Sequence, residues 1–301
     1  VGSEMCIRDS IMHERTSFTE NTVTLTAPVT SANIIPPGED VAAGTLLVPK
    51  GKILTASDLA LIAGQGIAEI GVYKKLSIGL ISTGSELLNT GSPLEYGKIY
   101  NTNPYLLGGY IQKHHMTANY LNTVSDDLDS LCRAVLEALK TNDIVITTGG
   151  VSAGDFDYMP EVIRRIGGDL LFHRLKFKPG GAMLGAFKDG KVILGLSGNP
   201  GAAATGLLCV GFPFMRKLSG RSDITFSQAT AYLGVDFKKS SPVTRILKGH
   251  SDFKNGMLYF TPLSNQHNGS VSSMSDCDLL AVIPAGSKPL AAGDKLEVYI
   301  L

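Results

Sequence analysis

The sequence predicts an α/β fold whose centre is a three-layer, mostly parallel sheet. Short apolar segments rich in β-branched residues alternate with segments of helical periodicity, which is the pattern of parallel βαβ units. Each apolar segment ends in a loop of glycine and polar residues, as strands do where they border a ligand crevice. The strands expected in this sheet are Ser77–Ser82, Ile144–Ile146, Leu170–Phe177 and Val192–Leu196.

Helices are expected between and after these strands. Pro104–His114 is predicted as one crossover helix, and Leu128–Leu139 as another because its large apolar residues recur along one face. Asp126 and Asp127 precede the second helix, where negative charge favours the positive end of the helix dipole. Gly201–Leu218 is predicted as an apolar helix.

Two further patterns extend this plan. Asp189-Gly190 is a hairpin signal between apolar segments, so the sheet is expected to carry an antiparallel element. After Ser227, short alternating segments separated by turn residues predict a small C-terminal β-barrel-like domain. The strands expected there are Ala229–Val235, Met257–Thr261 and Leu279–Ile283.

Length and composition predict several modest domains. The chain has 301 residues, of which 44% are hydrophobic, enough to form sizeable cores. Residues 1–10 begin without methionine and are predicted to be a remnant outside the fold. Breaks near Gly71–Lys75 and Gly220–Asp223 divide the rest into an N-terminal mixed or β segment (11–75), the α/β domain (76–220) and the C-terminal β domain (221–301).

Charge and cysteine content argue against several classes of protein. The 27 basic and 27 acidic residues balance without a polybasic run, so nucleic acid is not an expected partner. The four cysteines show no Cys-x-x-Cys spacing, which favours reduced thiols in the cytoplasm over disulfides or zinc. The most apolar run, Gly206–Met215, is too short to span a membrane.

The segment Ile144–Tyr158 predicts an oxyanion site that also holds a metal. Gly149 and Gly150 let the backbone bend and approach a ligand closely, and successive N–H groups in such a turn can cradle an anion. Asp155 and Asp157 would repel a bare phosphate, so a hard divalent cation is expected between carboxylate and phosphate. The alternative is an ordinary strand exit whose acids cap the next helix.

Several motifs in this order resemble the molybdopterin molybdenumtransferase family, which includes the E domain of gephyrin and is similar in this core to the molybdopterin adenylyltransferases. Ordered motifs at several places are far more specific than any one of them. The resemblance covers about Ile11 to the C-terminus. It rests on Thr83–Leu87 (TGSEL), Ile99–Pro104 (IYNTNP), Thr148–Asp157 (TGGVSAGDFD), Lys178–Gly180 (KPG) and Gly198–Pro200 (GNP).

The resemblance implies a reaction and a set of site residues. Enzymes of this family take adenylylated molybdopterin and molybdate, release AMP and leave molybdenum on the dithiolene; relatives are homodimers. By motif position, Asp157 and Glu86 would hold Mg²⁺, and Asp40 falls where the family has another functional acid. Molybdate would need the cation and hydrogen-bond donors of Lys178, Ser152 and Arg245, and the pterin and phosphate pocket would be shaped by Gly149, Gly150 and Pro200. The adenylyltransferase is a further expected partner.

The chain also departs from the family pattern. No Met-Asp-Gly occurs, so the usual Ser-x-Met-Asp-Gly segment is missing and the N-terminal domain is expected to be partial. Ser85 replaces an aspartate, Gly181 replaces the second lysine of Lys-Pro-Gly-Lys, and Ser197 replaces a proline. Losing one charged hydrogen bond to an anion costs about 1.5–3 kcal/mol. These departures favour a non-catalytic molybdopterin-binding or scaffold protein as the alternative function.

A serine hydrolase is the second alternative. Gly150–Gly154 matches Gly-x-Ser-x-Gly after a strand, with Ser152 as the nucleophile and histidines downstream. Two acids directly after the serine would oppose a developing oxyanion, and no helix is predicted to begin directly behind Ser152. The sequence therefore favours the transferase.

Overall fold

The chain divides into two units, one made of Val1–Pro49 and Leu54–Ala68 and the other of Lys50–Ile53 and Glu69–Leu301. The computed structural model describes residues 11–28, 37–151 and 157–301. In the first unit, β1 (Thr16–Phe18) pairs antiparallel with β2 (Val23–Leu25) after a short 3₁₀ helix, His13–Arg15. Helix α1 (Ala56–Gly64) begins with a capping box between Thr55 and Asp58.

The second unit is built on a six-stranded mixed sheet with the strand order β6-β3-β7-β11-β10-β8. The first four strands are parallel, and β10 and β8 run antiparallel to their neighbours. Interior strands are buried on both faces, which is why their sequences are almost continuously apolar. The strands are β6 (Thr117–Tyr120), β3 (Ser77–Ser82), β7 (Ile144–Thr148), β11 (Lys191–Leu196), β10 (Leu184–Lys188) and β8 (Asp169–His173).

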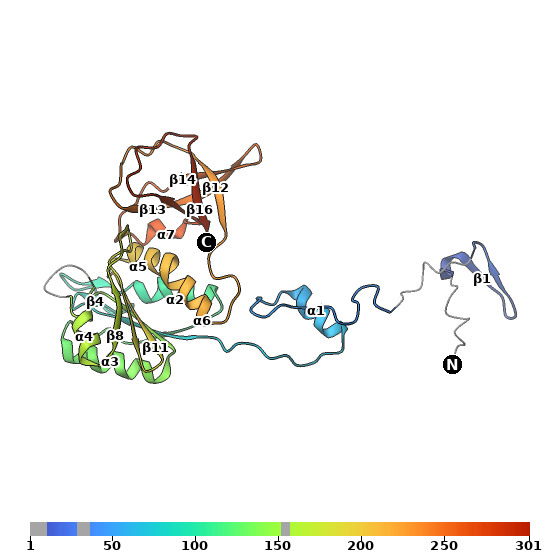
Figure 1. Cartoon of the computed structure of the whole chain (residues 1–301), viewed down its shortest axis with the longest axis horizontal. Coiled ribbons are helices and arrows are strands. Elements are labelled where there is room, and N and C mark those ends of the chain that lie inside the picture. Colours follow the sequence, from blue (N-terminus) through green and yellow to red (C-terminus); the bar gives the residue numbers. More distant parts are fainter. Residues whose placement is uncertain (1–10, 29–36, 152–156) are drawn as a thin grey trace. The chain divides into compact units, whose positions relative to one another are not determined.

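Helices cover both faces of this sheet, so the predicted three layers are confirmed (Figure 1). Ile144 and Ile146 of β7 pack in one core with α2 (Asn103–Lys113), α5 (Pro200–Gly206) and α6 (Phe212–Leu218). Val145, on the opposite face, packs with α3 (Leu128–Thr141) and α4 (Met159–Arg165). Successive side chains of β7 thus point to opposite faces of the sheet and enter different cores.

The predicted helix Gly201–Leu218 is present but is not uniformly α-helical. Leu207–Gly211 forms a π-helical turn between α5 and α6. Pro213 follows in the first turn of α6. A proline inside a helix lacks an N–H donor and crowds the carbonyl four residues earlier. A local π turn accommodates this change without ending the helix.

The predicted strand Leu170–Phe177 is wrong as a single strand. It is split into β8 and β9 (Phe177–Lys178), which belong to different sheets. The backbone turns at Arg174, whose φ of 65° lies in the left-handed region. After this turn β9 pairs parallel with β13 (Thr244–Lys254) of the C-terminal domain.

The C-terminal strands close into a five-stranded barrel, as predicted. The order is β14-β12-β16-β15-β13, and an additional β13–β14 pairing closes the ring. Closure pairs the strand edges that an open sheet would expose. The remaining barrel strands are β12 (Gln228–Leu233), β14 (Met257–Pro262), β15 (Leu279–Ile283) and β16 (Lys295–Ile300), with α7 (Ser272–Ser275) between β14 and β15.

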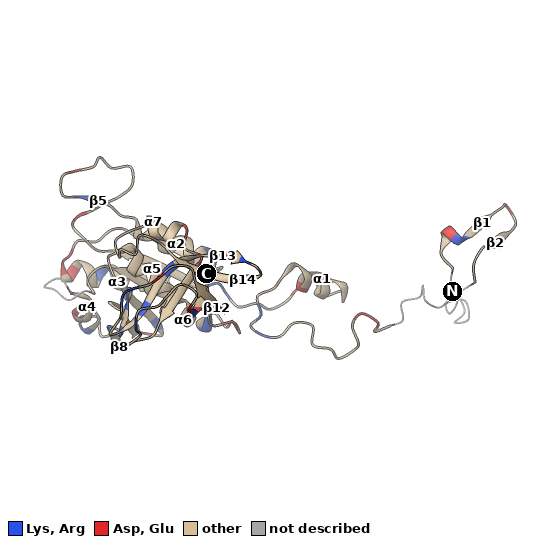
Figure 2. Ribbon diagram, turned by 90° about the horizontal axis from the view of Figure 1, so that it is seen from above, with Lys and Arg blue, Asp and Glu red and all other residues tan. Residues whose placement is uncertain are grey.

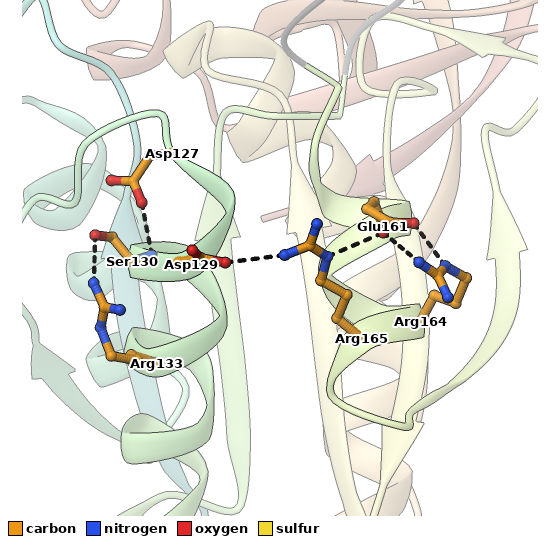
Figure 3. A network of polar contacts seen from close by, with 7 residues as sticks. All are labelled: Asp127, Asp129, Ser130, Arg133, Glu161, Arg164 and Arg165. Atoms are coloured by element: carbon orange, nitrogen blue, oxygen red, sulfur yellow. Dashed lines mark hydrogen bonds and ion pairs between the residues drawn. The ribbon is translucent and has the colours of Figure 1, made fainter.

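A surface network links α3 to α4 (Figure 3). Asp127 caps α3 by accepting a hydrogen bond of 2.8 Å from the Ser130 amide. The hydrogen bond from the Ser125 hydroxyl, and then that from the Ser130 amide, lower the pKa of Asp127 to about 2. Arg165 of α4 donates to Asp129 at 2.9 Å and to Glu161 at 3.1 Å. Exposed ion pairs of this kind stabilise a fold little, so the network orients α4 more than it holds the domain together.

Acidic and basic residues are interspersed along the ribbon, in keeping with the balanced charge of the sequence (Figure 2). Among the helices that the structure describes, none is both long and apolar enough to cross a membrane.

A buried cationic cluster joins the end of α2 to α6. Arg216 is only 5% exposed; its guanidinium lies 4.2 Å from the centre of the Phe226 ring and donates to His114 Nδ1 at 3.3 Å. The His114 ring also contacts the Phe212 ring edge to face. Burial, and then the charge of Arg216, lower the pKa of His114 to about 4, so the imidazole stays neutral and accepts the hydrogen bond.

His114 should make stability depend on pH. The unfolded chain binds a proton at this histidine below about pH 6.5, whereas the folded chain resists protonation down to about 4. Stability contributed by the neutral ring is therefore present above pH 6.5 and lost as pH falls toward 4. We expect the melting temperature to fall between pH 7.5 and 5, and to fall less in His114→Gln, which keeps an acceptor without titrating. An equal fall in both proteins would contradict this assignment.

Candidate active site

Three predicted loops meet where β3, β7 and β11 end. Thr148 of β7 pairs in register with Ser82 on one side and Leu196 on the other. Beyond the strands, the Thr83 amide donates to the Thr148 carbonyl at 2.9 Å, and the Gly149 amide donates to the Leu196 carbonyl at 3.0 Å. Parallel pairing thus brings these loops to one edge of the sheet, where a crevice was predicted.

The loop after β7 depends on glycine at two positions. Gly149 and Gly150 have φ of 99° and 66°, in the left-handed region. A Cβ on Gly149 would overlap the Thr83 hydroxyl oxygen. The backbone therefore approaches its neighbour more closely than any side chain would allow.

Two asparagines that sequence reasoning did not assign to the site lie beneath these loops. Asn101 Oδ1 accepts from Ser82 Oγ at 3.3 Å, and Asn103 Nδ2 donates to the Gly198 carbonyl at 2.8 Å. Asn103 is 5% exposed, and its Oδ1 has no hydrogen-bond partner among the described residues. The signal that could have identified them is their position in Asn101-Thr-Asn-Pro104, between the short strand β5 (Ile99–Tyr100) and α2.

Asp157 lies just before α4, and its two carboxylate oxygens differ in their contacts. Its Oδ2 is 3.4 Å from His173 Nε2 and 3.5 Å from Arg174 Nη2. Its Oδ1 is buried and has no hydrogen-bond partner in the described part of the chain. The left-handed turn at Arg174 orders the segment that supplies both neighbours.

One described residue offers an oxygen atom suited to a divalent cation. Within residues 11–28, 37–151 and 157–301 no three histidine, cysteine or acidic side chains gather into a preformed metal site. The unpartnered Oδ1 of Asp157 is nevertheless the hard oxygen donor that Mg²⁺ prefers. Glu86 precedes β4 (Leu87–Leu88) and is exposed, with Oε2 only 2.6 Å from where a Cβ on Gly84 would lie.

The two cations predicted for molybdate lie on neighbouring strands. Lys178 of β9 is the register partner of Arg245 of β13, although they are far apart in sequence. Lys178 is exposed, whereas the Nε of Arg245 is buried without a partner among the described residues. The Arg245 guanidinium lies 5.9 Å from the centre of the Phe237 ring.

The remaining predicted site residues lie in three different parts of the chain. Ser152 lies outside the described residues. Asp40 is an exposed residue of the N-terminal unit. Pro200 begins α5, and the turn before it is closed by a 3.2 Å hydrogen bond from the Asn199 amide to Ser197 Oγ. The first amide of α5 donates to the carbonyl of Asn268, in a barrel segment that was not predicted to reach this site.

Comparison with known proteins identifies the family. Residues 79–217 match the model of a probable molybdopterin binding domain, and residues 230–301 match the MoeA C-terminal region, domain IV. A molybdopterin molybdenumtransferase of Staphylococcus aureus is 34% identical over 96% of this chain and 70% of its own length. The chain belongs to the molybdopterin molybdenumtransferase family. A Bacillus subtilis member is 35% identical over 90% of this chain and 63% of its own length.

A solved MoeA structure agrees with this assignment. The molybdopterin biosynthesis MoeA protein of Pyrococcus horikoshii aligns with a TM-score of 0.81 at 25% identity, covering 96% of this chain and 71% of that one. The curated relatives are named as molybdopterin molybdenumtransferases, which are enzymes, and the solved neighbour is named as a protein of molybdopterin biosynthesis. The α/β domain and the closed barrel match its fold.

One departure from the family pattern has a steric explanation. Gly181 stands where the motif resemblance led us to expect a lysine. A Cβ at this position would overlap the carbonyl oxygens of Leu175 and Phe177. The preceding Gly180 packs closely against α5. A Cβ on Gly180 would lie 2.7 Å from the Gly206 amide nitrogen. In this chain the loop therefore has no space for a side chain at position 180 or 181.

Asn103→Ala should destabilise the site more than an ordinary surface change. It removes the hydrogen bond to the carbonyl of Gly198, an exposed residue, and a hydrogen bond of this kind typically contributes about 0.5–1.5 kcal/mol. Urea unfolding would measure the loss, with Asn122→Ala, at an exposed loop residue, as the control. Equal stabilities for Asn103→Ala and the wild type would refute the bridging role of this side chain.

Proposed function

We propose that this chain transfers molybdenum from molybdate to adenylylated molybdopterin, cleaving the phosphoanhydride with release of AMP. The observation that carries the proposal is Asp157 Oδ1, a buried carboxylate oxygen with no hydrogen-bond partner among the described residues, together with the positive-φ glycines that follow β7. Membership of the molybdopterin molybdenumtransferase family supports the same chemistry.

Asp157 and Glu86 would hold Mg²⁺ in this proposal. When bound, the ion would reduce the negative charge on the phosphoanhydride oxygens. Arg174 donates a hydrogen bond to Asp157 Oδ2, which among the described residues leaves Oδ1 as the oxygen for the cation. The positive-φ glycines after β7 let the backbone approach the phosphates closely.

Lys178 and Arg245 would bind the molybdate dianion. Charge-assisted hydrogen bonds to an oxyanion are about twice as strong as neutral ones, so paired cations favour such a ligand. Their register pairing across β9 and β13 supports a shared role. Ser152 and Asp40 complete the proposed set by motif position, and Pro200 and its turn would border the pterin.

We further propose that the enzyme acts as a cytoplasmic homodimer that receives its substrate from the molybdopterin adenylyltransferase. The balanced charge of 27 basic and 27 acidic residues supports a small-molecule substrate over nucleic acid.

A non-catalytic binding protein is the second candidate, and Gly181 is the observation that favours it. The loop has no space for the lysine that the family motif carries there, so one anion-binding charge is absent from this position.

Asp157→Ala should abolish Mg²⁺-dependent AMP release while the fold stays intact. The test is AMP release from adenylylated molybdopterin by purified protein, with Mg²⁺ and with or without molybdate. Asp169→Ala, at an exposed acid that begins β8, is the matched control and should keep wild-type turnover. Turnover by Asp157→Ala at the wild-type rate would refute the metal assignment. Tight substrate binding by the wild type without AMP release would support the binding protein instead.

Restoring the family lysine by Gly181→Lys should not restore function. The new Cβ would overlap two backbone carbonyls, and overpacking of this kind costs about 1–3 kcal/mol. We expect a lower melting temperature and no gain in molybdate-dependent AMP release. A gain in release at an unchanged melting temperature would contradict the steric account of the loop.

A further inference from the structure

Lys248, in the barrel strand β13, is a lysine buried completely inside the protein. Its exposed fraction is 0%. The ammonium donates to the His267 carbonyl at 3.2 Å and to the hydroxyl of Ser273. It forms no ion pair with a carboxylate in the part of the chain that the structure describes. Both partners are neutral groups of the segment that follows β14.

The backbone of Lys248 is tied to the same segment. The Gln266 side chain accepts a hydrogen bond from the Lys248 amide at 3.1 Å and donates one to the Lys248 carbonyl at 2.7 Å. Backbone and ammonium thus bind successive residues of one segment, which we call the capping segment, residues 266–270. Lys248 therefore contacts this segment through both its backbone and its ammonium group.

The capping segment lies against the first turn of α5. The Asn268 carbonyl accepts hydrogen bonds from the Gly201 amide at 2.7 Å and from the Ala202 amide at 3.3 Å. A Cβ on Gly201 would lie 3.0 Å from the Asn268 oxygen and 3.1 Å from Lys248 Nζ. A side chain directly after Pro200 would therefore require the carbonyl or the ammonium to move by a few tenths of an ångström.

Such a lysine is costly to stability. Removal of an ammonium from water is unfavourable, and neutral acceptors offset the cost less than a carboxylate would. Desolvation lowers the pKa of Lys248, as expected for a cation in such surroundings. Methionine has a similar length and would avoid the cost. A contribution other than stability therefore accounts for lysine at this position.

We propose that Lys248 is a positioning residue that holds the capping segment against α5, so that the barrel domain fixes the Ser197–Pro200 turn beside the substrate. The proposal rests on the proposed function, in which this turn borders the pterin. Lys248 itself does not touch the reacting atoms. Its effect passes through the Asn268 carbonyl to the first amides of α5.

The test is Lys248→Met in the full chain, followed by hydrogen exchange and kinetics. We expect the Gly201 and Ala202 amides to exchange faster while the β13–β15 ladder stays protected and the melting temperature is unchanged or higher. KM for adenylylated molybdopterin should rise about tenfold with a smaller change in kcat, as for lost binding contacts. Lys254→Met, an exposed lysine on the same strand, is the matched control and should match the wild type. Unchanged exchange at Gly201 and Ala202 would overturn the proposal.

Gly201→Ala provides a second test that leaves Lys248 in place. The added methyl group would press on the Asn268 carbonyl and on the ammonium, and should produce the same exchange and KM changes. This variant tests the positioning role if Lys248→Met fails to fold. Unchanged exchange and kinetics in Gly201→Ala would overturn the proposal. The exchange experiment needs no turnover, so failure of the proposed reaction is distinguishable from failure of the positioning role.

Discussion

The in-register parallel pairing of β7 with β3 and β11 is the constraint on which the rest of the structure depends. Because Thr148 pairs with Ser82 and Leu196, the three following loops begin at the same height along the sheet. A slip by one residue would turn every side chain of β7 to the opposite face and exchange the two cores. The same register that buries Ile144 and Val145 on opposite faces therefore also assembles the candidate site.

The sequence could predict this part of the fold because each residue there is required by its immediate surroundings. A buried strand must be apolar, and a strand exit that approaches a neighbour must be glycine, so Ile144–Ile146 and Gly149 carried their own signals. The turn at Arg174 carried none, because an arginine in the left-handed region is held there by surrounding contacts and not by its own preference. For that reason one predicted strand became two, in different sheets.

Long-range contacts of the site were also beyond sequence reasoning. Asn103 and Gly198 are far apart in the chain, and Asn268 reaches α5 from the barrel. Nothing in the local sequence around these residues distinguishes them from ordinary loop residues. Their contribution arises only after the α/β domain and the barrel pack together, because a carbonyl is a useful cap only where an unsatisfied amide faces it.

The junction of the two domains bears on the lysine that this chain lacks at position 181. If charge alone decided anion binding, Gly181 would weaken the proposed molybdate site by one cation. The backbone leaves no space for a side chain there, but it also carries β9 into register with β13, which places Arg245 beside Lys178. The proposed site thus draws one cation from each domain. An oxyanion bound between them would link the barrel to the α/β domain, in addition to the contact of Asn268 with α5.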